Sequence, residues 1–330
     1  DWQDMGIDLV IDHREKYYLH DMDGRRLIDV HLNGGTYNLG HRHPELVEVL
    51  KAGTSRFDMG NHHFPALART ALAEALAESA PGPELRYTAY GSGGGEAIDI
   101  ALKTARHATQ RRKIVSIIKA YHGHTGLAVK TGDDRFSKLF LSEDTVGEFV
   151  QVPFNDLNTM EDALKRRDVA AVIMETIPAT YGFPMPEEGY LPSVKQLCER
   201  YDTLYIADEV QTGLMRTGEL WGCTKYKVQP DIMVTGKGIS GGMYPIACVL
   251  ISEKCGGWLK EDGFAHMSTM GGAELGCVVA MKTLEIVQRP EVRSVVHFIS
   301  DYIRSGLDEI MEEYSDFFIG IRQHGLIMGL

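Results

Sequence analysis

The sequence predicts an α/β protein with a mostly parallel, doubly wound sheet and a second, smaller domain. The first observation is an alternation between about residues 85 and 252, where short apolar runs that end in Gly or polar residues are followed by helical stretches. Repeated β–α–β units of this kind form parallel sheets with helices on both faces. The second observation is size and composition. The 330 residues are 44% hydrophobic and 24% charged, which is typical of a globular chain with roughly two domains.

The large domain is expected over residues 56–273. It begins with an Ala/Leu/Glu-rich helix at 66–79 that Pro81-Gly82-Pro83 ends. Seven strands are expected, at 85–89, 113–119, 148–152, 169–175, 203–208, 231–235 and 245–251. The helices expected between them are at 94–109, 159–166 and 192–201. Ligands of such sheets bind beyond the carboxyl ends of the strands, so the residues that follow each strand are the candidates for chemistry.

The smaller, α+β domain is expected from residues 1–55 and 274–330. Its expected elements are short strands and turns over residues 1–55, with hairpin strands at 17–20 and 25–30, amphipathic helices at 274–288 and 291–314, and a strand at 317–322. The chain begins without Met and stops where another strand is expected to start. We therefore expect that further sequence belongs to the natural protein.

Charge and cysteine content exclude several classes of protein. The net charge is -12, so nucleic acid and anionic membranes are poor partners. The sequence has neither an apolar run near 20 residues nor a signal-peptide pattern, which predicts a soluble, cytoplasmic protein. The five cysteines include no C-x-x-C pair, so neither a disulfide framework nor a structural zinc site is expected.

A glycine-rich turn, Gly91-Ser92-Gly93-Gly94-Gly95-Glu96-Ala97, follows the first large-domain strand and opens a helix. Bare backbone N–H groups at a helix start bind phosphate. The turn is not a dinucleotide fingerprint, because Glu96 stands in place of the third glycine, and it lacks the G-K-[ST] of a P-loop. The alternative is a tight turn without a ligand.

Two further strand ends carry ionisable groups. Asp208 and Glu209 end an apolar strand, and neighbours on a strand point to opposite faces, so the two carboxylates cannot share one task. Lys237 lies between glycines just past the next strand, where a lysine beside other positive charge loses its proton more easily and attacks carbonyls. The nearby Gly238-x-Ser240-x-Gly242 matches a hydrolase nucleophile elbow only formally, because Lys237 holds the strand end. An ion-paired Asp208 and a solvated Lys237 are the plainer alternatives.

A fourth segment, Ala120-Tyr121-His122-Gly123-His124, places an aromatic ring at a strand end, where it can stack on a flat ligand. Its H-x-H spacing, like His41-x-His43 and His62-His63, is compatible with metal, but no Cys or carboxylate cluster accompanies any of them, so no metal is expected. One ligand accounts for all four segments. Pyridoxal 5'-phosphate (PLP) needs a phosphate site, a stacking face, an acid for its ring nitrogen and a lysine for its Schiff base.

These residues resemble the class III aminotransferases, of the fold-type I PLP enzymes, over nearly the whole chain. The most specific segment is Asp208-Glu209-Val210-Gln211-Thr212-Gly213 with Arg216-Thr217-Gly218, and the match extends back to Asn38-Leu39-Gly40-His41. The resemblance implies a homodimer or a dimer of dimers that transfers an amino group from an amino acid or ω-amine to a keto acid through an aldimine at Lys237. An aminomutase, an epimerase or a decarboxylase on the same framework is the alternative.

The resemblance also implies roles for individual residues. Catalytic roles fall to Lys237, Asp208 and Tyr121. Cofactor contacts fall to Gly94, Gly95, Tyr121, His122, Asp208, Val210, Gln211 and Lys237, and to Thr269, which would reach the phosphate in a partner subunit. Substrate contacts are expected from Tyr37, Glu175 and Tyr181, with Trp221 as a further pocket wall.

Three departures from the family pattern matter. Gly95 lacks the hydroxyl of the usual S-G-[ST]-E-A, so the backbone N–H is expected to act alone. Thr180 stands where many members carry a glutamate that pairs with a switching arginine, which puts that switch in doubt and favours selection by pocket shape. The C-terminal segment that carries the family's carboxylate-binding arginine is expected beyond Leu330.

Overall fold

The computed structural model describes residues 4–60 and 64–330, and its centre is a seven-stranded sheet in the order β4-β10-β9-β8-β7-β5-β6. The strands are β4 (Leu85–Gly91), β5 (Lys113–Ile117), β6 (Phe149–Val152), β7 (Val169–Glu175), β8 (Leu204–Asp208), β9 (Ile232–Thr235) and β10 (Ala247–Ser252). The strands from β6 to β9 pair in parallel, and β10 is antiparallel to both β4 and β9. The predicted mostly parallel, seven-stranded sheet is confirmed, with each strand end within two residues of its expected place.

Helices cover both faces of this sheet. On one face lie α3 (Leu67–Ser79), α6 (Leu157–Leu164) and α7 (Tyr190–Arg200), and on the other lies α4 (Gly94–Thr109). Strand β8 shows the reason, because Tyr205 and Ala207 belong to one apolar core and Leu204 and Ile206 to the other. Successive side chains of a strand alternate between its faces. The sheet is therefore doubly wound, as expected.

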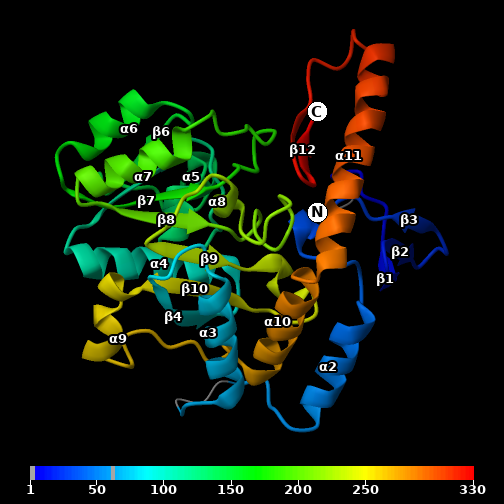
Figure 1. Ribbon diagram of the computed structural model, residues 1–330, viewed down its shortest axis with the longest axis horizontal. Helices are drawn as coiled ribbons and strands as arrows, with labels where there is room; N and C mark the ends of the chain where they lie inside the picture. Colours follow the sequence, from blue (N-terminus) through cyan, green and yellow to red (C-terminus); the bar gives the residue numbers. More distant parts are fainter. Residues whose placement is uncertain (1–3, 61–63) are drawn as a thin grey trace.

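The elements at the two ends of the chain gather at one end of the molecule, where Figure 1 shows β1–β3 and α11 far from α6 and α9. The elements outside the central sheet are β1 (Ile11–Glu15), β2 (Tyr18–Asp21), β3 (Arg26–Ile28), α1 (Leu32–Gly35), α2 (Pro44–Thr54), α10 (Glu274–Val287), α11 (Pro290–Glu313), β11 (Arg322–His324) and β12 (Ile327–Gly329). The shorter helices are α5 (Asp134–Leu139), α8 (Gly222–Lys225), α9 (Gly257–Glu261), η1 (Ala128–Thr131), η2 (Lys237–Ser240) and η3 (Glu253–Cys255). Strands β2 and β3 form the predicted hairpin.

Two sequence expectations about this end are wrong. The strand expected at 317–322 is absent apart from Arg322, and a short hairpin of β11 and β12 turns instead at Gly325, which has φ +58° and packs against Thr217. Ile319 is fully exposed, so the apolar run that suggested a strand has no core to join. Helix α2 was expected as strands and turns, although Pro44 at its first turn is a helix-start signal.

The site elements meet because the carboxyl ends of β7, β8 and β9 lie side by side. Glu175 pairs in register with Asp208, and Asp208 with Val234. All five cysteines are buried and unpaired, as expected of small apolar residues. In the described part of the chain, no helix has both the length and the apolar character that crossing a membrane requires.

Candidate active site

The amine of Lys237 points into a buried pocket at the end of β9. Lys237 opens η2 with φ 45°, a left-handed conformation, and its Nζ donates a hydrogen bond to Gln211 Oε1 at 2.9 Å. Burial lowers the pKa of Lys237, and the nearby Arg216 acts in the same direction, against the carboxylates of Asp208 and Glu175. A lysine with a lowered pKa has more of the neutral amine that attacks carbonyl carbons.

Asp208 is held at the end of β8 by hydrogen bonds to both of its oxygens. Its Oδ2 lies 2.7 Å from His122 Nδ1, and its Oδ1 accepts from the Val210 N–H at 3.0 Å. Asp208 and His122 are both buried. The other ring nitrogen, His122 Nε2, is fully buried and has no hydrogen-bond partner. The arrangement fixes a carboxylate that can face a cationic ring nitrogen.

Glu209, the neighbour of Asp208, points away from this pocket and has a structural task. It accepts hydrogen bonds from the N–H groups of Gly222 (2.6 Å) and Cys223 (2.9 Å) and from the Thr176 hydroxyl. These contacts tie β8 to the start of α8. The prediction that the two adjacent carboxylates cannot share one task is confirmed.

The side chains predicted to enclose a flat ring lie around the same pocket. A Cβ placed on Gly94 or on Gly236 would stand 3.4 Å from a methyl of Val210, so Val210 lies against both of these segments. Tyr121 is half-exposed, and its N–H donates to Glu175 Oε1 at 2.9 Å. The residues that line the pocket are Gly94, Gly95, Ile98, Tyr121, His122, Gly123, Glu175, Asp208, Val210, Gln211 and Lys237.

The glycine loop forms one end of this pocket. Gly94 and Gly95 are the first two residues of α4, where backbone N–H groups have no helical partner. Glu96 accepts from both the N–H and the hydroxyl of Ser92, each at 2.7 Å, and so holds the turn in place. A Cβ on Gly95 would stand 2.7 Å from Thr125 Oγ1. The Thr125 hydroxyl therefore lies beside Gly95, where the sequence predicted no hydroxyl.

Glu175 occupies the floor of the pocket at the end of β7. It accepts from the N–H groups of Tyr121 and Ala179, the latter at 3.1 Å. Burial raises the pKa of Glu175 to about 7; His122 opposes this shift, and Asp208 adds to it. Burial, with help from Glu175, raises the pKa of Tyr181 to about 12. Glu175 therefore changes charge near neutral pH.

Three predicted residues lie away from this pocket within one chain. Thr269 is exposed, on a loop between α9 and α10. Tyr37 packs on Gly242 and on the ring of His41, with ring centroids 4.2 Å apart. Trp221 is buried in the core, with its indole N–H donating to the Ser79 carbonyl at 2.6 Å. The expectation that Trp221 forms a pocket wall is wrong, because its large ring packs in the core instead. The predicted His62-His63 pair lies outside the described residues.

Sequence reasoning also assigned no task to Arg216. Its Nε donates to the Gln211 carbonyl at 2.8 Å, and its Nη2 donates to the Gly35 carbonyl. Among residues 4–60 and 64–330 it has no acidic partner, and burial lowers its pKa to about 10. The only advance signal was its place in the Arg216-Thr217-Gly218 motif. The structure thus holds an unpaired cation beside the residue that binds the Lys237 amine.

Comparisons with known proteins agree with this geometry. The chain matches the family described as Aminotransferase class-III over residues 2–330. It is 48% identical over 326 residues to an uncharacterized aminotransferase from Archaeoglobus fulgidus. The aligned residues cover 99% of this chain and 76% of the relative. Ornithine aminotransferase from Toxoplasma gondii superimposes with a TM-score of 0.90 at 26% identity, over 98% of this chain and 77% of that one. Taurine:2-oxoglutarate aminotransferase from Bifidobacterium kashiwanohense, solved with PLP and glutamate, superimposes with a TM-score of 0.88 at 26% identity, over 97% of this chain and 76% of that one.

The chain belongs to the class III aminotransferase family, within the fold-type I PLP enzymes. It is accordingly a PLP-dependent aminotransferase. The pocket fits this cofactor. It combines a buried amine of lowered pKa, a hydrogen-bonded carboxylate at a strand end and a helix start that is open to an anion.

Proposed function

We propose that Lys237 holds the cofactor and moves the proton during amino-group transfer. The observation that carries this is the buried Lys237 amine, which shares one pocket with the Asp208 carboxylate. PLP supplies an aldehyde carbon and a ring that accepts electrons. Once a donor amine has displaced it from the cofactor, the freed Lys237 Nζ would take a proton from the substrate carbon that bears the amino group and later give it back, as general base and then acid.

The other residues position this chemistry. Asp208 would keep a proton on the ring nitrogen. The Gln211 amide would orient the lysine through Oε1 and the ring oxygen through its NH2 group, and Val210 and Tyr121 would exclude water from the two ring faces. The N–H groups of Gly94 and Gly95 bind the phosphate. Borohydride reduction followed by peptide mapping tests the assignment, which requires that the cofactor be fixed on Lys237. Attachment to another lysine contradicts it.

The substrate in this proposal carries a carboxylate that meets Arg216. Gln211 links the Lys237 amine to the Arg216 guanidinium. Its side chain accepts a hydrogen bond from Lys237, and its backbone carbonyl accepts one from Arg216. The Gly34–Gly35 pair joins them again. A Cβ on Gly34 would lie 3.6 Å from Lys237 Nζ, and the Gly35 carbonyl accepts from Arg216. A guanidinium with no acidic partner attracts carboxylates. Tyr181 and Tyr37 remain candidates for shaping the substrate's far end.

No arginine switch based on a glutamate at position 180 operates in this proposal. The Thr180 hydroxyl donates to the Lys119 carbonyl, so the side chain is engaged with the backbone and offers no charge. Instead, the shape of the pocket and the positive charge of Arg216 select the amino donor. Efficient use of glutamate and of an ω-amine alike by the wild-type enzyme contradicts this selection.

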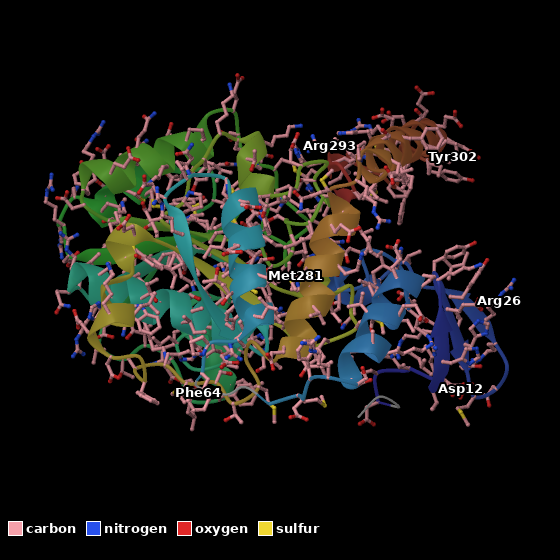
Figure 2. The ribbon with its side chains drawn as sticks, turned by 60° about the horizontal axis from the view of Figure 1, so that its bottom comes forward. Asp12, Arg26, Phe64, Met281, Arg293 and Tyr302 are labelled. Carbon is pink, nitrogen blue, oxygen red and sulfur yellow. The ribbon has the colours of Figure 1, made fainter. Side chains whose placement is uncertain are left out.

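The working unit in this proposal is a homodimer. Thr269 reaches the phosphate of the partner subunit. The exposed side chains of Phe64 (77%), Phe264 (67%) and Met267 (46%) line one hollow together with Ser268, the residue before Thr269. Figure 2 shows Phe64 at the edge of the molecule. Burial of such side chains between two copies removes apolar area from water. Sedimentation should show no appreciable monomer, and a fully active monomer contradicts the proposal.

Two coarser assignments complete the proposal. Residues 56–273 form the large domain, and residues 1–55 and 274–330 the small one; the separate grouping of β1–β3 and α11 supports this division (Figure 1). The enzyme works in the cytoplasm. Five buried, unpaired cysteines are in keeping with a reducing compartment.

A further inference from the structure

We propose that Thr125 supplies the hydroxyl that Gly95 lacks, and so binds the phosphate group of the cofactor. The proposal rests on the placement of that phosphate at the start of α4. It replaces the expectation that the backbone of Gly95 acts alone. It also explains why position 95 is a glycine, since the space for a side chain is already filled by Thr125.

The contact between the two segments is close on both sides. A Cβ on Gly95 would stand 2.7 Å from Thr125 Oγ1 and 3.2 Å from Thr125 Cγ2. In the other direction, a Cβ on Gly123 would stand 2.7 Å from Gly95 Cα, and Gly123 has φ +97°. The two distances of 2.7 Å are shorter than the contacts that Cβ atoms make in proteins. The turn at residues 123–126 therefore fits onto the first turn of α4 only while positions 95 and 123 are glycines.

Asp99 fixes the position of the turn at residues 123–126 along the axis of α4. Position 99 lies one helical turn beyond Gly95, on the same face. Its Oδ2 accepts from Thr125 Oγ1 at 2.9 Å, and its Oδ1 accepts from the Ala128 N–H at 2.8 Å. When the hydroxyl turns its proton toward a phosphate oxygen, Asp99 keeps the Ala128 N–H. Because Asp99 is half-buried, water can reach its other oxygen.

The Thr125 hydroxyl would donate to the phosphate from a direction that the N–H groups at the start of α4 do not cover. The N–H groups of Gly94 and Gly95 have fixed directions along the helix axis, whereas a threonine hydroxyl from another segment approaches from the side. The dianionic phosphate accepts from several directions at once. Hydrogen bonds to charged groups are the strong ones in proteins, so loss of this hydroxyl should be measurable as cofactor affinity.

The test compares Thr125→Val, which keeps the shape and loses the hydroxyl, with Thr125→Ser, which keeps it. Dissociation constants are measured by absorbance for PLP and for pyridoxal, which lacks the phosphate. We expect Thr125→Val to weaken PLP binding about 10- to 100-fold, with pyridoxal unchanged and Thr125→Ser close to wild type. Unchanged PLP affinity in Thr125→Val overturns the proposal, and so does an equal loss for both ligands, because that reports loop support alone.

Two further variants separate the possible failures. In Thr125→Ala, a second change, Gly95→Ser, should restore PLP affinity by returning a hydroxyl from the helix side. Asp99→Asn keeps the Thr125 hydroxyl and should bind PLP at least as well as wild type; a loss equal to that of Thr125→Val overturns the proposal. Gly95→Ala, which adds bulk without a hydroxyl, tests the phosphate placement. If it weakens the binding of PLP but not of pyridoxal, while Thr125→Val weakens neither, the placement stands and the Thr125 proposal fails. If neither matters, both fail.

Discussion

Replacement of Asp208 by Asn should abolish most turnover while leaving the fold intact. The carboxylate is buried, its Oδ2 lies 2.7 Å from His122 Nδ1, and its Oδ1 accepts from the Val210 N–H. An amide keeps this shape and one accepting oxygen but removes the charge that keeps a proton on the ring nitrogen. Loss of one preorganised contact at a reacting centre costs about 2.7–4 kcal/mol, so kcat/KM should fall at least about 10²-fold.

The neighbouring carboxylate provides the matched control. Glu209 is just as buried, yet its hydrogen bonds go to Gly222, Cys223 and Thr176 on the far side of β8. Glu209→Gln should lower stability by about 1–3 kcal/mol, since a buried N–H loses its acceptor, but turnover per bound cofactor should remain. Half-reaction rates from stopped-flow absorbance, with melting temperatures of both variants, decide the matter. Near wild-type turnover in Asp208→Asn, or equal losses in the two variants, refutes the reasoning.

Three other predictions follow from the described contacts. Burial raises the Glu175 pKa from 4.5 to about 7, so the folded chain keeps a proton that the unfolded chain releases, and stability should fall as the pH rises between those values. Glu175→Gln should remove this part of the decline in melting temperature, and an unaltered decline would argue against it. Trp221→Ala should cost about 3–5 kcal/mol in urea unfolding without changing the preferred donor; a changed preference would return Trp221 to the pocket. Arg216→Met should raise KM about 10- to 100-fold for amines that carry a carboxylate, but not for uncharged amines, and equal effects on both would make Arg216 structural.

The sheet and the ends of its strands could be predicted because their signals are local. Alternation of apolar runs with helical stretches predicted all seven strands, and the chemistry-bearing residues lie at the end of β8 or shortly after β4 and β9. Asp208 and Lys237 are 29 residues apart in sequence. They lie in one pocket because β8 and β9 are parallel neighbours, which place their carboxyl ends at the same edge.

The missed residues depend on contacts between distant segments. Thr125 meets Gly95 across 30 positions, and Arg216 meets the Gly35 carbonyl across 181, so no periodicity or spacing reports either contact. Trp221 was misplaced for a related reason. An aromatic residue near a motif can line a pocket or fill a core, and only the packing of its neighbours decides between them.

Burial of this pocket decides which of its groups stay charged. Near neutral pH, burial moves Lys237 toward the neutral amine and Glu175 toward the protonated acid, because each shift removes a charge that water no longer solvates. The Asp208 carboxylate is hydrogen-bonded at both of its oxygens, to His122 Nδ1 and to the Val210 N–H, which fixes its position at the end of β8. Arg216 keeps its charge because its pKa, though lowered to about 10, stays well above neutral. One constant cation for the substrate then remains beside an amine that can gain and lose a proton. In that arrangement the proton of the reaction moves at Lys237, while the charge that orients the substrate stays constant.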